Sequence, residues 1–177
     1  MNRFNQLYES LIKEEPETRH TESPAFKKWF KDSKLVDKEG NPKIFYHGTK
    51  KPFYVFDKAK DAETGGQNLY GTGFYFFSTE FPANTYGKLM HVYLSMKNPL
   101  KTDSGGLYRS YGKKAGATYH LRDVNRVELS RLIQADGYDG VIVDSKYPEY
   151  IVFEPTQIKS ATDNNGRFDV KNPDIRR

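Results

Sequence analysis

The amino-acid sequence predicts an α+β fold: a small, mostly antiparallel pair of sheets flanked by a few short helices. Two observations lead to this prediction. The segments with a strand pattern are short and numerous, and helical segments do not alternate with them as a parallel α/β sheet requires. The chain has 177 residues and no internal repeat, which favours a single domain.

The composition limits the classes of protein that the chain can belong to. It contains no cysteine, which excludes disulfides, thiolate metal sites and a cysteine nucleophile. No apolar run approaches the roughly 20 residues that a membrane span needs, and the first residues lack a secretory apolar stretch. We therefore expect a soluble protein of the cytoplasm, in a bacterial or a host cell.

The net charge of +5 leaves two interpretations open. Dispersed lysines on a solvated surface account for such a value. A basic surface also attracts an anionic ligand or a nucleic acid.

Shifts in composition divide the chain into three parts. Residues 1–22 hold an amphipathic helix over 4–15 and a polar linker, and this helix either packs back onto the domain or docks a partner. Residues 23–161 form the main domain. Residues 162–177 are polar, and we expect a weakly ordered tail.

The local patterns in the main domain predict the following elements. Ser23-Pro24 begins a helix over 25–31, and Asn125 begins another over 125–135. A further helix is predicted over 79–86. A turn is predicted at 37–42, a loop at 58–72 and a mobile loop at 103–118. Strands are predicted at 43–46, 53–56, 73–77, 91–96, 141–143 and 150–153.

Several common catalytic motifs are missing from the sequence. There is no Gly-rich phosphate-binding loop, no GxGxxG and no GxSxG. The four histidines, His20, His47, His91 and His120, lack the spacing of metal ligands, so no metal is predicted.

Three segments remain, each with a polar or ionisable group where an apolar strand ends or begins. Such positions tend to line clefts. The segments are Tyr46-His47-Gly48-Thr49, Gly71-Thr72-Gly73-Phe74-Tyr75-Phe76 and Pro148-Glu149-Tyr150-Ile151-Val152-Phe153-Glu154-Pro155. Gly48, which has no side chain, leaves the backbone open to close approach by a ligand.

Taken in order, the three segments resemble the motifs of the ADP-ribosyltransferase superfamily, in its His-Tyr-Glu branch with diphtheria toxin and poly(ADP-ribose) polymerases. The chain from about residue 25 to 161 is similar to the ADP-ribosyltransferase domains of phage polyvalent proteins. The resemblance implies a split β-sandwich of short antiparallel strands. It also implies NAD as co-substrate, with no metal.

The resemblance further implies a role for each matching residue. His47 hydrogen-bonds the ribose next to nicotinamide, and Gly48 pairs through its backbone with the nicotinamide amide. Thr49 belongs to the same NAD-binding motif. Tyr75 and Tyr86 pack against the nicotinamide ring. Glu149 grips a ribose hydroxyl and stabilises the positive charge that develops as the glycosidic bond breaks.

The sequence departs from the family pattern at two places. Ala83 stands where members often carry a serine that holds the nicotinamide amide. The loop before Glu149, residues 144–148, is short, which leaves the identity of the acceptor open. Glu154 is a rival for the catalytic role, although it fits the motif less well than Glu149.

The favoured function is mono-ADP-ribosylation of a macromolecule, with a protein as the first choice, in a phage or bacterial effector or toxin. Two alternatives keep the fold and change the acceptor. One is a nucleic acid, which the Lys- and Tyr-rich loop at 108–120 would suit, and the other is water. A non-catalytic NAD-binding module and a phage structural or injected component are further alternatives. An antitoxin or docking partner could bind residues 4–15.

Overall fold

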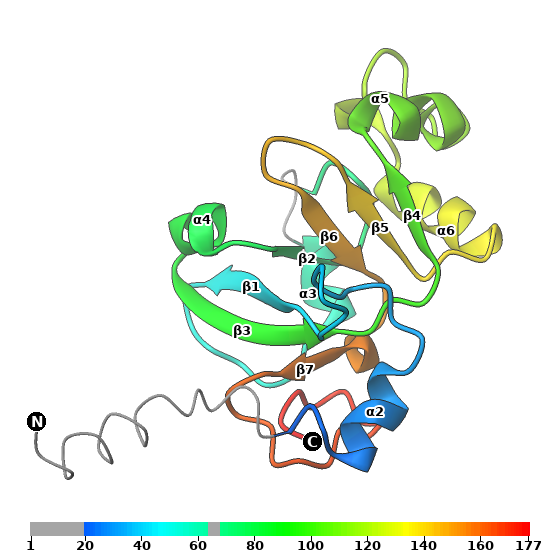
Figure 1. Ribbon diagram of the computed structural model, residues 1–177. Coiled ribbons are helices and arrows are strands. Elements are labelled where there is room, and N and C mark those ends of the chain that lie inside the picture. Colours follow the sequence, from blue (N-terminus) through cyan, green and yellow to red (C-terminus); the bar gives the residue numbers. More distant parts are fainter. Residues whose placement is uncertain (1–19, 64–67) are drawn as a thin grey trace, which may run out of the picture.

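A mixed sheet organises the part of the chain that the computed structural model describes, residues 20–63 and 68–177 (Figure 1). The helix predicted over 4–15 lies outside these residues. Seven strands form the sheet within them: β1 (Ile44–Thr49), β2 (Phe74–Phe77), β3 (Lys88–Leu94), β4 (Pro99–Thr102), β5 (Gly140–Val143), β6 (Glu149–Val152) and β7 (Ile158–Ser160). The α+β prediction is confirmed.

The sheet consists of two halves that meet at a narrow junction. The strand order is β4-β5-β6-β2-β1-β3-β7, and every pair is antiparallel except β4 with β5. A single pairing, Tyr46 with Phe77, joins β1 to β2, whereas β1 pairs with β3 along its whole length. In Figure 1 the strands β4, β5 and β6 run steeply, while β1, β3 and β7 cross below them at a large angle. This junction is the split that the resemblance implied.

Short helices cover the sheet, and side-chain caps fix where the two main ones begin. Helix α2 (Pro24–Phe30) begins after Ser23, whose Oγ accepts a hydrogen bond from the Phe26 amide at 3.1 Å. Helix α6 (Arg126–Ala135) begins after Asn125, whose Oδ1 accepts from the Glu128 amide at 3.0 Å. The predicted helices at 25–31 and 125–135 are thus confirmed to within one residue.

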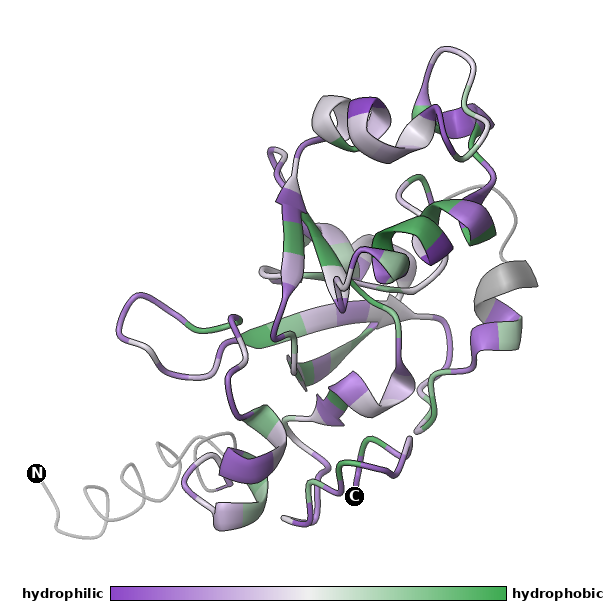
Figure 2. Cartoon of the chain, turned by 90° about the vertical axis from the view of Figure 1, so that its right-hand side faces the viewer, coloured by the Kyte–Doolittle hydropathy of each residue, from purple (hydrophilic) through white to green (hydrophobic). Residues whose placement is uncertain are grey.

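The core lies on both faces of the sheet. On one face, Val141, Val143 and Ile151 pack against Leu129 and Ile133 of α6. On the other face, aromatic and aliphatic side chains of β1, β2 and β3 pack with Phe56, Ile158 and Ile175. Figure 2 shows the hydrophobic residues gathered in the central strands and the hydrophilic ones in the connections.

Two segments that were expected to be loops contain helix instead. Residues 58–72 begin with α3 (Lys58–Glu63), and Asp57 Oδ1 accepts a hydrogen bond from the Ala59 amide at this helix start. Residues 103–118 contain α5 (Ser104–Leu107), capped by Asp103, and a π-helical turn, η2 (Tyr108–Gly112). Leu107 and Tyr111 are buried in the core, so this segment is anchored rather than mobile.

The expectation of a weakly ordered tail at 162–177 was wrong. Phe168 and Ile175 are each only 2% exposed. The buried Lys159 of β7 donates from Nζ to the Asn172 carbonyl at 2.7 Å, and the Ile175 amide donates to the Tyr54 carbonyl at 2.9 Å. The segment is polar in composition but is held by backbone hydrogen bonds and two apolar anchors.

The remaining differences from the predicted elements have local causes. The strand predicted at 53–56 is an irregular segment, in which only Val55 pairs, with Asp174. Strands β4 and β7 were missed: β7 has only three residues, and β4 begins at Pro99, where the pattern of the preceding predicted strand ends. The helix predicted over 79–86 is broken into α4 (Glu80–Ala83) and the 3-10 turn η1 (Asn84–Tyr86). Phe81 has φ −89° and ψ 130° within α4, since the helical region is disfavoured for a residue before proline.

Candidate functional site

His47 lies on β1 just past the junction of the two half-sheets, and its ring bridges the gap between the separating strands. Its Nδ1 lies 2.9 Å from the carbonyl oxygen of Tyr75 on β2. A carbonyl can only accept, so Nδ1 carries the proton, and Nε2 of the neutral ring is left as an acceptor. Burial lowers the pKa of His47, which favours this neutral form.

Aromatic side chains surround the His47 ring on one face of the sheet. The centroids of Phe53, Phe56 and Phe76 lie 5.9, 5.1 and 5.5 Å from it. Because side chains alternate along a strand, His47 shares this face with Phe45. The orientation of the imidazole is therefore fixed by packing as well as by its hydrogen bond.

Gly48 permits a close approach, but by the protein's own chain. A Cβ at this position would lie 1.9 Å from the carbonyl oxygen of Ala83 and 2.9 Å from the Cβ of Tyr86. On the side where a side chain would stand, Gly48 is thus covered by the segment 83–86 rather than by a ligand. Next to it, the Thr49 hydroxyl donates to the Lys51 carbonyl at 3.0 Å.

Tyr75 is fixed through its phenol group. Its hydroxyl donates to the Gly71 carbonyl at 2.7 Å and accepts from the Tyr70 amide at 3.2 Å. The two glycines of the motif pack tightly: a Cβ on Gly71 would meet Ser130 Oγ at 2.3 Å, and one on Gly73 would meet Ile151 Cγ2 at 2.7 Å. The glycines therefore bring β2 close to α6 and β6, which sets the position of Tyr75.

Glu149 is the first residue of β6 and is half-buried. It pairs with Phe77 on one side and with Val143 on the other. Burial raises the pKa of Glu149 above the usual value for a glutamate. By register, its side chain shares a face with Phe77 and Tyr75, and Tyr75 lies one diagonal away, at about 7 Å between Cα atoms.

Tyr86 pairs with a ring that the sequence analysis did not single out. Its ring is parallel to that of Phe77, at an interplanar angle of 13°, with the centroids 6.5 Å apart, and the Tyr86 side chain is half exposed. Phe77 lies two residues after Tyr75, on the same face of β2. Strand alternation after Tyr75 was the signal that would have identified it.

The structure brings some of the predicted residues together and separates others. Tyr75, Phe77 and Glu149 share one face, and the Tyr86 ring lies parallel to that of Phe77. His47 contacts the backbone of Tyr75 but belongs to the opposite face, with β2 between it and Glu149. Glu154 lies beyond the other end of β6, where it is exposed and forms an ion pair with Lys58 at 2.5 Å. Of the two glutamates, Glu149 is the one beside the predicted motifs.

Two further properties concern the described residues alone. Among residues 20–63 and 68–177, no cluster of three or more His, Cys, Asp or Glu side chains has the arrangement of a metal site. Within the same ranges, no helix has both the length and the apolar character of a membrane span.

Comparison with known proteins identifies one family. The family model described as "ADP-Ribosyltransferase in polyvalent proteins" matches residues 37–168. No curated protein matches. Among solved structures, a crystal structure of an anti-CRISPR protein is similar at 13% sequence identity and a TM-score of 0.40, over 65% of this chain and 90% of that chain.

Proposed function

Because the chain belongs to the family of ADP-ribosyltransferases in polyvalent proteins, we propose that it splits NAD and transfers the ADP-ribose to a macromolecular acceptor. The observation that best supports this proposal is the position of Glu149. This half-buried carboxyl group begins β6 and shares a face with Tyr75 and Phe77, next to the exposed ring of Tyr86.

In the proposed reaction, the bond between nicotinamide and the ribose carbon breaks, and nicotinamide leaves with the bonding electron pair. The ribose becomes an oxocarbenium-like cation, which an ionised carboxylate at Glu149 stabilises. A nucleophile of the acceptor then forms the new bond to the same carbon and loses its proton. The pyridinium ring of NAD is cationic, and the aromatic faces of Tyr86, Phe77 and Tyr75 would each favour it by roughly 0.5–2 kcal/mol.

His47 has a different part in this proposal. Its side chain belongs to the opposite face from Glu149, but β1 and β2 separate beyond the Tyr46–Phe77 pair, and we propose that a ribose hydroxyl reaches Nε2 through this gap. Nδ1 is committed to the Tyr75 carbonyl, so Nε2 is the nitrogen that accepts the hydrogen bond. The ring is fixed before NAD binds, which reduces the entropy lost on binding. The Gly48 backbone would pair with the nicotinamide amide, and Thr49 would line the same end of β1.

The biological setting is part of the proposal as well. We propose an effector or toxin of phage or bacterial origin that acts in the cytoplasm. The resemblance to ADP-ribosyltransferase domains of phage polyvalent proteins supports the phage origin, and the cysteine-free sequence fits a reducing compartment.

The direct test is release of nicotinamide from NAD by the purified protein, measured by chromatography, with and without cell lysate. Glu149→Gln keeps the size of the side chain and removes its charge. Glu154→Gln is the matched control, because it makes the same change at the other end of β6.

The proposal expects release by the wild type and by Glu154→Gln, and a loss of at least 100-fold in Glu149→Gln. Release that depends on lysate indicates transfer, and release in buffer alone indicates hydrolysis. If no lysate supports release although NAD binds, the protein is a binding module and the catalytic proposal is wrong.

A further inference from the structure

We propose that the acceptor is a single-stranded nucleic acid, bound along one edge of the molecule beside Glu149. This acceptor edge consists of Phe81, the loop 144–148 and the segment 104–122, which we call the basic arm. The proposal rests on the transferase function for its last step, but binding at this edge can be tested without catalysis.

The sheet topology brings the basic arm and the loop 144–148 to the same end of the molecule. Strands β4 and β5 are parallel, and their last residues, Thr102 and Val143, are paired. The chain therefore leaves both strands at one end of the sheet, and the Asp144 amide still donates to the Thr102 carbonyl at 2.8 Å. Glu149 begins β6 at this same end.

Exposed aromatic rings border the site at this edge. Phe81 is 50% exposed and Tyr147 is 37% exposed, and the two rings meet edge to face with their centroids 5.2 Å apart. The contact joins the segment that carries Tyr86 to the loop that precedes Glu149. The Lys146 ammonium lies 5.2 Å from the Tyr147 ring. An unpaired base that stacks on these rings would lie close to Glu149, with a cation next to it for its phosphate.

The basic arm concentrates positive charge next to these rings. Residues 104–122 contain four basic residues and no acidic one, in a chain whose net charge is +5. All four basic side chains are exposed, and Tyr119 is 84% exposed. Two of the nearby acids are engaged, since Asp103 caps α5 and Asp123 pairs with His120 at 3.1 Å, whereas Asp144 in the loop 144–148 is exposed. The four basic residues are Arg109, Lys113, Lys114 and Arg122.

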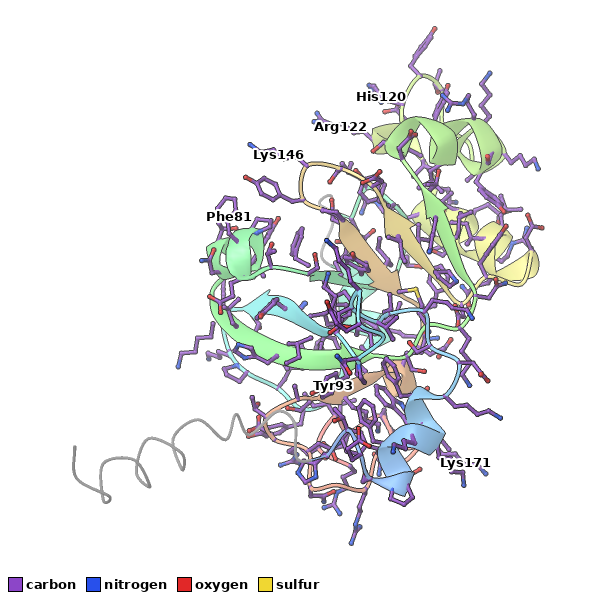
Figure 3. The ribbon with its side chains drawn as sticks, in the orientation of Figure 1. Phe81, Tyr93, His120, Arg122, Lys146 and Lys171 are labelled. Atoms are coloured by element: carbon purple, nitrogen blue, oxygen red, sulfur yellow. The ribbon has the colours of Figure 1, made fainter. Side chains whose placement is uncertain are left out.

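The combination favours nucleic acid over protein as the acceptor. Figure 3 shows Phe81, Lys146, Arg122 and His120 in succession along one edge of the molecule, with Lys171 far from them at the opposite end. Interleaved rings and cations are the usual surface for single strands, because every base has a face that can stack and every nucleotide carries a phosphate. A protein acceptor would need an acidic face to match these four like charges, whereas every nucleotide carries a negative charge.

Binding is tested by fluorescence polarisation with labelled single-stranded DNA and RNA of about 16 nucleotides, without NAD, over a range of salt concentrations. The variants are Tyr147→Ala and the double variant Lys113→Ala/Lys114→Ala. Lys171→Ala is the matched control, since it removes one exposed lysine far from the acceptor edge. The same oligonucleotides are then incubated with NAD that carries a label on its adenylate.

We expect saturable binding of a single strand, weakened about tenfold by Tyr147→Ala. The double lysine variant should reduce the slope of log affinity against log salt by about 1.4. Lys171→Ala should bind as the wild type does, and label should appear on the oligonucleotide.

Two binding results would overturn the proposal: no saturable binding of the oligonucleotide, or equal binding by all variants. A third would come from labelled NAD added to cell lysate, if the ADP-ribose label remained on protein after nuclease treatment. If the oligonucleotide binds as expected but no nicotinamide is released under any condition, the acceptor edge stands as a binding surface and the transferase proposal fails.

Discussion

Replacing Gly48 by alanine tests how the site is built. The added methyl group would lie 1.9 Å from the Ala83 carbonyl oxygen and 2.9 Å from the Tyr86 Cβ, whereas ordinary contact begins at about 3.4 Å. Backbone atoms cannot rotate away as a flexible side chain can. The segment 83–86 must therefore move away from β1 by about 1.5 Å.

This displacement has two consequences of different size. Overpacking of this kind costs about 1–3 kcal/mol of the free energy of unfolding, which lowers the Tm of a chain of this length by roughly 2–12 °C. Tyr86 moves with the segment, which changes its position relative to Phe77. A misplacement of about 1 Å can reduce catalysis about 100-fold, so nicotinamide release should suffer more than stability does.

The assay combines thermal unfolding with kcat/KM for nicotinamide release. Gly105→Ala is the control: in α5, its nearest neighbour is the flexible guanidinium of Arg109, at 3.1 Å. We expect an unchanged or slightly raised Tm for this control, since alanine favours a helix over glycine. If Gly48→Ala unfolds at the wild-type temperature and releases nicotinamide at the wild-type rate, the segment 83–86 is not held against β1 as described.

Three further predictions follow from other groups. Burial lowers the pKa of Lys159 to about 8, below its usual 10.5. Between these two pH values the unfolded chain keeps the proton and the folded chain does not, so the free energy of unfolding rises with pH. Lys159→Met should abolish this rise, measured as Tm against pH. Because burial raises the pKa of Glu149, nicotinamide release should begin to fall at a higher pH than it would with an ordinary glutamate, and the stability that this group contributes is lost as pH rises through the raised pKa. The pH profiles of nicotinamide release and of unfolding, measured for wild type and Glu149→Gln, would show both effects. A fall of activity at the ordinary glutamate pKa would contradict the first. Tyr111→Phe removes the 2.7 Å hydrogen bond to Asp136 and should cost about 1.5–3 kcal/mol in urea unfolding, while a cost near zero would show that this bond does not hold the basic arm.

Local signals in the sequence were sufficient to predict much of the fold. Caps at Ser23 and Asn125 fix helix starts by hydrogen bonds to neighbouring residues, so a short window of sequence holds the needed information. Strand β7 and the segment after it could not be found in this way. Their order depends on Lys159 and Ile175, whose partners in space are distant in sequence.

The candidate site was predictable as a set of motifs but not as a geometry. The motifs gave His47, Tyr75, Tyr86 and Glu149, and the assignment of their roles stays a prediction. Which face of the sheet each side chain occupies depends on strand register, which single motifs do not reveal. For this reason the opposite facing of His47 was not anticipated. Phe77 was missed although alternation along the strand after Tyr75 places it on the same face.

The division of the chain at residues 22 and 161 also stays a prediction. The residues before 20 lie outside the described part. The residues after 161 pack against the domain, with Phe168 among the rings of α2. A boundary drawn from composition alone does not register such contacts.

The hold of residues 172–177 on the segment 53–56 affects when the site can exist during synthesis. The Ile175 amide binds the Tyr54 carbonyl, and the Arg176 guanidinium lies 3.8 Å above the Tyr54 ring. The same segment supplies Phe53 and Phe56, which pack against His47. A nascent chain that has emerged from the ribosome only as far as Glu149 already contains every predicted site residue. It lacks residues 172–177, which hold the segment 53–56 in place against His47. The site is therefore complete only after residues 172–177 have been translated and have packed against the segment 53–56.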